Sequence, residues 1–116
     1  MTLRGKQTLS AATVAFALAV GAPVMAAGQD AAKGKEVYAA QKCSTCHSIA
    51  GQGKKQNPLD GVGSKLSAAD IKEWIVNPKE MTAKTKSTKK PVMPAKYSKL
   101  PPADIDALVA YMQSLK

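Results

Sequence analysis

The feature that most constrains how this chain can fold is a pair of cysteines three positions apart, followed directly by the only histidine. Cys43 and Cys46 enclose two residues, and His47 comes next. A disulfide across so short a loop removes little entropy from the unfolded chain. Small domains with few large apolar side chains usually need a metal or another large insert for stability. The sequence therefore predicts that these three side chains hold such a group.

A Cys-x-x-Cys-His pattern is typical of covalent attachment of a c-type haem. Thiols three positions apart on a helical turn can reach two vinyl groups along one porphyrin edge, while the adjacent imidazole is carried beneath the iron. A dithiol oxidoreductase would need a βαβ context, which is absent, and a zinc site would need a further ligand. We therefore expect one haem c, attached by Cys43 and Cys46, with His47 as an iron ligand.

The length of 116 residues allows one domain. It excludes two-domain dehydrogenases, barrel enzymes and long repeat arrays, because each needs far more chain. The formal net charge is +9. Nucleic acid is not the expected partner, because the few aromatic residues lie outside basic runs and offer a weak platform for stacking bases. These aromatic residues are Phe16, Tyr38, Trp74, Tyr97 and Tyr111.

Residues 1–26 have the layout of a secretory signal peptide. Arg4 and Lys6 precede an almost wholly apolar stretch, residues 8–20, and small residues precede a cut after Ala26. Cleavage there predicts export to the periplasm. Because only two basic residues and no acidic residue are removed, the formal charge of the remainder is +7.

Two alternatives remain for this leader. A cut after Ala27 fits nearly as well. The uncharged stretch 7–29 is also long enough to span a bilayer, so the leader could be retained as an anchor. We expect cleavage, which leaves one domain of residues 27–116 with no membrane span.

Two helices are predicted in the first two thirds of that domain. Asp30 is the expected N-cap of a helix that continues to Lys42 and carries Gly34 on one face. Ser67 begins a second helix with a capping box, and Pro78 is expected to end it.

The closing segment, residues 104–116, predicts a third helix after Pro102, with one apolar stripe along it. The first and last helices are expected to pack through Gly34 and Tyr111. No run alternates apolar and polar residues well enough for a strand, so the domain is expected to be all-α. The stripe consists of Ile105, Leu108, Val109, Met112 and Leu115.

Five segments in this order carry a resemblance to one family. Residues 34–38 (GKEVY), 43–47 (CSTCH), 57–63 (NPLDGVG) and 71–78 (IKEWIVNP) precede the closing helix 104–116. The chain resembles the class I c-type cytochromes, monohaem electron carriers of bacterial periplasms and mitochondria. The resemblance implies a small fold of about three main helices wrapped around one covalently attached haem.

Several residues are candidates for the second axial ligand of the iron. His47 is the only histidine, so bis-histidine ligation within one chain is excluded, and a thioether is the usual alternative. Met112 lies on the apolar stripe of the last helix and fits a core role. Among the remaining candidates the resemblance favours Met93 as the distal ligand and puts Met81 at the start of a loop. Met81, Lys90 and water stay open as alternatives.

The resemblance also gives roles to Pro58 and Trp74. It implies that the backbone carbonyl of Pro58 accepts the N–H of the His47 imidazole. It implies that Trp74 lies on the distal side near the methionine. An ordinary loop proline and simple core packing are the respective alternatives.

Seven lysines gather between the second and last expected helices, with Glu80 the only acidic residue among them. The resemblance puts this segment beside the exposed haem edge, where lysines would steer an acidic redox partner into position. A solvated loop is the alternative. Residues 83–90 also form a longer segment than compact family members have. The lysines are Lys79, Lys84, Lys86, Lys89, Lys90, Lys96 and Lys99.

Taken together, the sequence predicts a monomeric periplasmic electron carrier and not an enzyme. Iron ligated on both faces, by His47 and Met93, leaves no open position for a substrate, so one-electron transfer through the haem edge is the chemistry that remains. A haem enzyme or gas sensor with an open distal site is one alternative. A dithiol oxidoreductase without haem is another.

Overall fold

The structure is a computed structural model that describes residues 27–116, so the expected signal peptide lies outside the described residues. The fold is mostly helical, as predicted. No helix in residues 27–116 is long and apolar enough to cross a membrane. In chain order the elements are α1 (Ala27–Ala40), the 3-10 helix η1 (Cys43–Thr45), β1 (Ser48–Ile49), β2 (Gln52–Gly53), α2 (Val62–Lys65), α3 (Ala68–Val76), α4 (Pro78–Thr85), the 3-10 helix η2 (Ala95–Lys99) and α5 (Pro102–Ser114).

Helix α1 differs from its predicted bounds at both ends. It begins at Ala27, so Asp30 lies within the first turn instead of capping it. There its carboxylate complements the positive end of the helix dipole. The helix ends at Ala40, and Lys42 adopts a left-handed backbone conformation with φ 56°. That conformation turns the chain toward Cys43.

Helix α3 confirms the predicted cap, because the Ser67 Oγ accepts a hydrogen bond from the Asp70 backbone N–H at 3.1 Å. The helix buries Ile71 and Ile75. It ends before Pro78, as expected, but the same proline is the first residue of α4. Proline suits that position because the first turn of a helix leaves its N–H groups unbonded.

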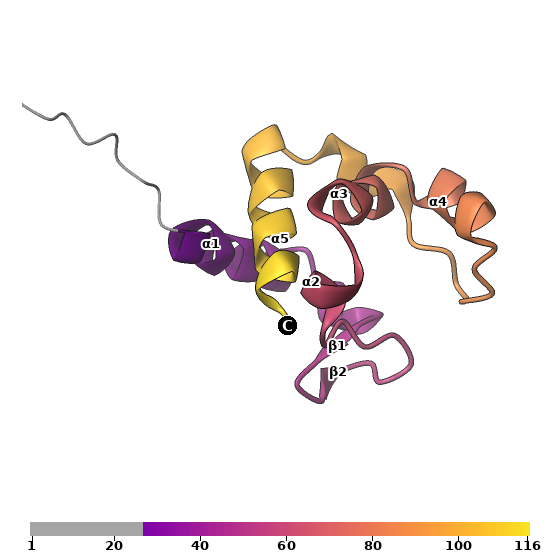
Figure 1. Cartoon of the computed structure of the whole chain (residues 1–116), viewed down its shortest axis with the longest axis horizontal. Helices are drawn as coiled ribbons and strands as arrows, with labels where there is room; N and C mark the ends of the chain where they lie inside the picture. Colours follow the sequence, from indigo (N-terminus) through magenta and orange to yellow (C-terminus); the bar gives the residue numbers. More distant parts are fainter. Residues whose placement is uncertain (1–26) are drawn as a thin grey trace, which may run out of the picture.

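Helices α1 and α5 pack closely, as the sequence predicted from Gly34 and Tyr111 (Figure 1). A Cβ on Gly34 would overlap the Ala107 carbonyl oxygen and come within 2.6 Å of the Tyr111 Cβ. Beside this contact, the Tyr38 and Tyr111 rings meet edge to face with centroids 5.8 Å apart. No larger residue than glycine would allow the two backbones to approach this closely.

The expectation that no strand forms was wrong. β1 and β2 pair as an antiparallel hairpin whose two-residue turn is Ala50 and Gly51, with φ of 51° and 78°. Positive φ at both positions is the geometry of a type I′ turn. The Asp60 Oδ1 accepts the Ala50 N–H at 2.8 Å and ties the turn to the following loop. Two-residue strands are too short to show alternation in the sequence.

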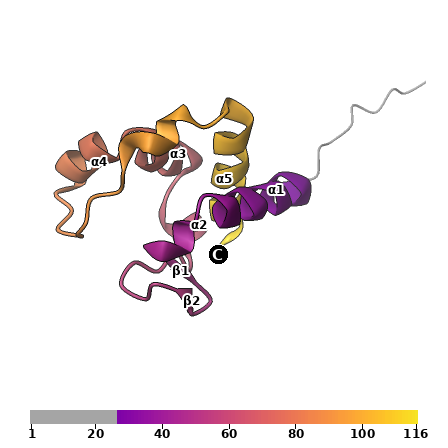
Figure 2. The same ribbon diagram turned by 180° about the vertical axis from the view of Figure 1, so that it is seen from behind.

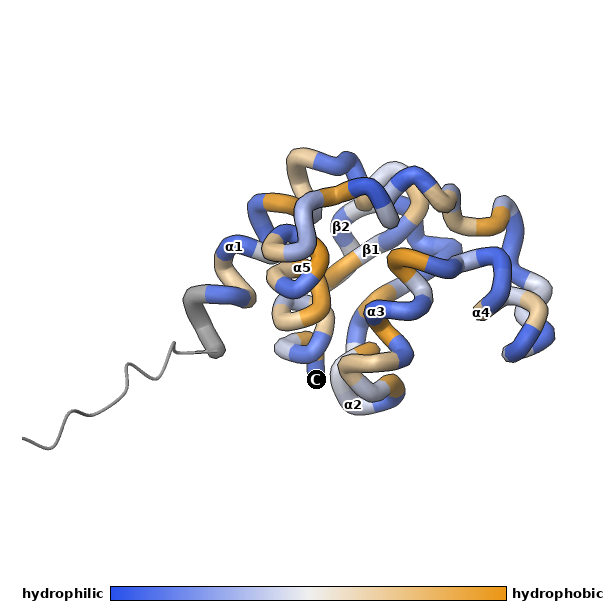
Figure 3. Tube along the Cα trace, turned by 90° about the horizontal axis from the view of Figure 1, so that it is seen from above, coloured by the Kyte–Doolittle hydropathy of each residue, from blue (hydrophilic) through white to orange (hydrophobic). Residues whose placement is uncertain are grey.

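The core lies between α1, α3 and α5, where hydrophobic and hydrophilic residues alternate along α3 and α5 (Figure 3). Part of this core also lines a large cavity, so the helices do not close over their own apolar faces. The buried core residues are Val37, Ile71, Ile75, Ile105, Leu108 and Met112.

Candidate functional site

A cavity of about 610 Å³ brings the predicted site residues together. Its wall includes Cys43, Cys46 and His47 from η1 and the residues just after it, and Met93 from the segment between α4 and α5. Figure 2 shows that segment returning past α3 before α5 begins. The volume lies within the range of roughly 300–1,000 Å³ that is usual for ligand and cofactor sites. Trp74 lines the same cavity.

The attachment residues lie on one helical turn. The backbone N–H groups of Cys46 and His47 both donate to the Cys43 carbonyl oxygen, at 3.1 and 3.0 Å. Both thiols and the imidazole line the cavity. The spacing that the sequence suggested is therefore realised as a turn that directs three donor groups into one space.

The β1–β2 hairpin and the residue after it contact the backbone of this turn. A Cβ on Gly53 would overlap the His47 carbonyl oxygen and lie 3.0 Å from the Ser44 carbonyl oxygen. The Lys54 N–H donates to the same two carbonyl oxygens, at 3.1 Å for Ser44 and 3.0 Å for His47. The sequence analysis missed this contact, although a glycine two residues after Gly51 is a signal of close backbone approach.

The His47 ring is held by Asn57, not by Pro58 as the resemblance implied. The Nδ1 atom lies 3.1 Å from the Asn57 carbonyl oxygen. A carbonyl only accepts, so Nδ1 carries the proton and the Nε2 lone pair is left to bind a metal. The prediction was wrong by one residue because Ser48 pairs with Pro58 in a short parallel bridge, which turns the Asn57 carbonyl toward the ring.

Asn57 also contributes its side chain, a role that the sequence analysis did not assign. Its Nδ2 donates to the Cys46 carbonyl oxygen at 3.2 Å. The same residue therefore holds the histidine through its main chain and the attachment turn through its amide.

Burial shifts the pKa values of His47 and Cys43 in directions that favour the neutral form of each side chain. It lowers the pKa of His47, and the hydrogen bond to the Asn57 carbonyl opposes this only in part, so the neutral, metal-binding imidazole is favoured. Burial also raises the pKa of the Cys43 thiol, and the neighbouring Cys46 adds to that rise, while Lys96 opposes it. The thiolate is therefore disfavoured, in contrast to the low thiol pKa of reactive dithiols.

Met93, Met81 and Met112 occupy different environments. Met93 is partly buried and lines the cavity together with Pro91 and Pro94. Met112 reaches the cavity too, but it belongs to the buried core, as predicted. Met81 was expected at the start of a loop, whereas it is buried within α4 and is not part of the cavity lining. The reason is that Pro78 starts a new helix instead of a loop.

Two polar residues of the distal wall, Thr82 and Ser87, were not singled out from the sequence. They line the cavity together with Tyr97 and with Lys89, which is one of the seven lysines expected beside the haem edge. The ammonium group of Lys96 lies 5.2 Å from the centre of the Tyr97 ring. Thr82 and Ser87 belong to no motif, so only the folded chain shows that they meet the cavity.

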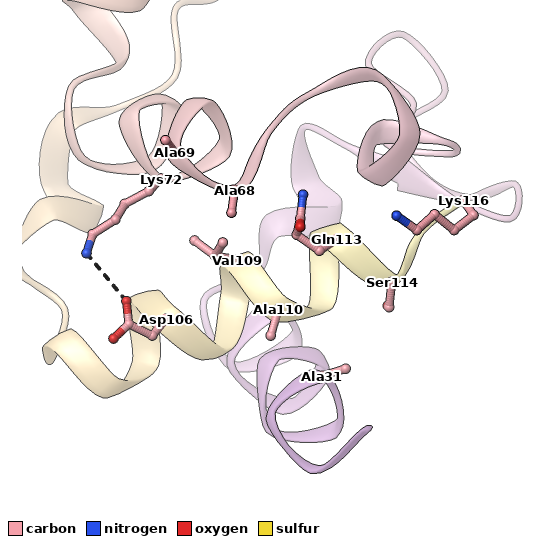
Figure 4. A pocket seen from close by; sticks show the side chains of 10 residues that line it. All are labelled: Ala31, Ala68, Ala69, Lys72, Asp106, Val109, Ala110, Gln113, Ser114 and Lys116. Atoms are coloured by element: carbon pink, nitrogen blue, oxygen red, sulfur yellow. Dashed lines mark hydrogen bonds and ion pairs between the residues drawn. The ribbon is translucent and has the colours of Figure 1, made fainter. Parts of the chain in front are cut away.

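A second cavity, of about 740 Å³, lies among α1, α3 and α5 (Figure 4). Small side chains such as Ala31, Ala68 and Ala110 line it, and Lys72 pairs with Asp106 at 3.4 Å on its border. It contains no sulfur and no imidazole. The cavity beside η1 is therefore the candidate functional site.

A chain that directs two thiols and an imidazole from one helical turn into a cavity of this size is suited to hold a haem covalently, and a thioether lies in the same cavity wall. The family model for cytochrome c matches residues 31–116, and the chain belongs to the cytochrome c family. Members of this family bind haem c covalently through cysteines, which are Cys43 and Cys46 in this chain. No curated protein and no solved structure matched the chain.

Proposed function

We propose that this cytochrome c is a class I, monohaem electron carrier of the periplasm, with His47 and Met93 as axial ligands, and that it is not an enzyme. One observation carries the proposal: the two attachment thiols, the neutral imidazole and the Met93 thioether all line a single cavity. Haem c, when attached, supplies a one-electron iron couple whose potential depends on the axial ligands.

The choice of Met93 is supported by its surroundings. It lies in an irregular segment between two prolines, whose fixed φ angles stiffen the backbone that presents the thioether. Met112 is 6% exposed and packs in the core with Leu108. Met81 lies outside the cavity lining. Met93 is therefore the methionine best able to reach the iron without disturbing the core.

An optical spectrum of the oxidised protein tests this function. Methionine ligation predicts a low-spin spectrum with a weak methionine-to-iron charge-transfer band near the red edge. A high-spin spectrum would contradict the proposal and support an enzyme or gas sensor with an open distal site. The mass of the purified chain tests the dithiol alternative, because covalent haem adds its own mass to the polypeptide.

We also propose that an acidic redox partner docks at the lysine-rich segment between α3 and α5. Lys89 and Lys96 line the cavity, so positive charge lies beside the expected haem edge. Such charge raises association rates at low salt. Lys96→Glu should lower the rate of electron exchange with an acidic partner, and the difference should shrink as ionic strength rises. Lys35→Glu on α1 is the control, and an equal effect there would argue against this docking site.

The periplasmic location is proposed from residues 1–26, whose pattern is that of a cleaved signal peptide. The exported protein should begin at Ala27 or Gly28 and should elute as a monomer in size-exclusion chromatography. N-terminal sequencing that found Met1 on periplasmic material would favour a retained anchor instead.

A further inference from the structure

Lys89 differs from the other lysines of its segment because it lines the cavity and its side chain also bonds to the loop after β2. Its Nζ donates to the Gln56 carbonyl oxygen at 3.4 Å, which links the chain after α4 to the loop after β2. Its backbone N–H donates to the Ser87 Oγ at 3.3 Å, and the Ser87 N–H donates to the Thr82 carbonyl oxygen at 3.0 Å. Local hydrogen bonds therefore hold the backbone of Lys89, and the bond to Gln56 directs its ammonium group toward the loop after β2.

The charge around the cavity is of one sign. Within residues 27–116 the charged side chains of its lining are Lys42, Lys89 and Lys96, and no aspartate or glutamate is among them. Lys42 directly precedes Cys43, and Lys96 is close enough to lower the pKa of that thiol. These two lysines therefore lie at the attachment edge.

The other elements around the cavity contribute no charge that could compete with Lys89. Tyr38, Tyr97 and His47 are the titratable groups of the lining besides the lysines and the two thiols. Helices α2, α3 and α5, with the residue that follows α2, contribute only uncharged side chains: Val62, Leu66, Ile71, Trp74, Ile75, Leu108 and Met112. Lys89 is therefore the cation of the α4 side of the cavity.

The chemistry of the cofactor gives that cation a partner. In haem c the vinyl groups and the two carboxylates lie on opposite edges of the porphyrin, so a haem held by the two cysteines would have its carboxylates on the edge away from them. Figure 1 shows α4 and the chain after it on the side of the molecule opposite α1, from which the attachment turn follows. A carboxylate in a cavity is costly to bury unless a cation or hydrogen bonds compensate for its lost hydration.

We propose that Lys89 is the counter-charge for a haem carboxylate and, through Gln56, holds the chain after α4 against the proximal loop. The proposal rests on the electron-carrier site described above. In the described part of the chain the Nζ of Lys89 contacts no carboxylate, and its hydrogen bond to Gln56 is long, so it is available for a stronger partner.

The test compares Lys89→Gln with Lys90→Gln in purified holoprotein. Each variant removes one positive charge from the same segment, but Lys90 does not line the cavity. The measurement is the reduction potential as a function of pH. The potential falls with rising pH where the carboxylate loses its proton, because the new negative charge disfavours the added electron. A nearby cation lowers a carboxyl pKa by about one to three units, so this fall should move up by about one pH unit or more in Lys89→Gln.

Lys90→Gln should keep the wild-type pH profile, and Lys89→Arg should restore it. Identical profiles for Lys89→Gln and Lys90→Gln would overturn the proposal. An infrared difference spectrum between the oxidised and reduced protein gives a second measurement, in which only Lys89→Gln should shift the carboxylate bands. Failure of the electron-carrier assignment would be seen separately, because the wild-type protein would then lack the methionine-to-iron band.

Discussion

The turn that carries His47 and the segment that carries Met93 face the same cavity, but the chain holds them in different ways. On the proximal side, the Asn57 carbonyl accepts from the imidazole and the Lys54 N–H binds two carbonyl oxygens of the attachment turn. A buried Ser48, 3% exposed, accepts the Leu59 N–H at 2.8 Å. The polypeptide itself therefore sets the proximal geometry.

The distal segment has much less support of this kind. Helix α4 ends at Thr85, and Lys86 adopts a left-handed conformation with φ 53°. Within the part of the chain that the structure describes, residues 90–93 make no hydrogen bond. Val92 is 36% exposed, which is the most among the large apolar side chains described. The position of Met93 thus depends on its flanking prolines and on what it contacts across the cavity.

This difference suggests that the two sides have separate roles: the proximal side holds the haem, and the distal side sets its spectrum and reduction potential. Changes on the proximal side should remove the haem or loosen the turn that holds it. Changes on the distal side should leave the haem attached and alter its spectrum and potential. Each prediction below tests that division.

The largest effect is expected for Cys43→Ala or Cys46→Ala. Each variant loses a covalent tether and with it the apolar insert around which the open core is built, so stable holoprotein should be largely abolished. Haem content per folded chain, measured by absorbance, checks this result. Ser44→Ala is the matched control in the same turn, since its side chain is exposed. A normal yield of folded, haem-containing Cys43→Ala protein would contradict the role of the proximal side in holding the haem.

Met93→Ala should keep the haem attached, because Cys43, Cys46 and His47 are untouched. Loss of the thioether should remove the charge-transfer band and lower the reduction potential by on the order of a hundred millivolts. The fall is expected because a thioether stabilises ferrous iron better than water or an amine does. Spectroscopy and a redox titration of the purified variant measure both changes.

Met81→Ala is the control for that experiment. Met81 is 5% exposed within α4, so its truncation should destabilise the protein by about 2–5 kcal/mol. The band and the potential should remain. If Met81→Ala removed the band while Met93→Ala kept it, the ligand assignment would be wrong although the family would stand.

Gly53→Ala should loosen the proximal turn. The added Cβ would collide with the His47 carbonyl oxygen, and φ of 105° disfavours any other residue, so we expect a loss of more than about 1 kcal/mol in the free energy of unfolding. Gly51→Ala is the comparison, because Gly51 also has positive φ but no atom lies within 4 Å of its added Cβ. Denaturant unfolding should show the larger loss at Gly53.

Much of the fold was predictable because its signals are local. The Ser67 cap, the end of α3 before Pro78 and the packing of Gly34 on α5 follow from single residues and their spacing. The cysteine and histidine pattern likewise predicted the proximal half of the site. The signal for each feature lies in a single residue or in a short spacing, which a sequence displays directly, although the contact of Gly34 with Ala107 joins distant segments.

The remainder depends on contacts between segments that the sequence does not display. Ser48 pairs with Pro58, and this register makes Asn57 the acceptor for His47. Pro78 can end one helix or start another, and only packing decides, as the burial of Met81 in α4 shows. Lys89 lines the cavity and bonds to Gln56, a residue 33 positions away.

The smallest effect is expected for Asn57→Ala. The variant loses the hydrogen bond from Nδ2 to the Cys46 carbonyl oxygen, which is worth about 0.5–1.5 kcal/mol. It keeps the main-chain carbonyl that accepts from the His47 Nδ1, so the imidazole stays oriented and the reduction potential should hardly change. Unfolding and redox titration of the variant measure the two quantities. A fall in potential as large as that of Met93→Ala would mean that the amide side chain, and not the main chain, fixes the ring. The proximal geometry would then depend on one replaceable side chain, and the contrast with the distal segment would fail.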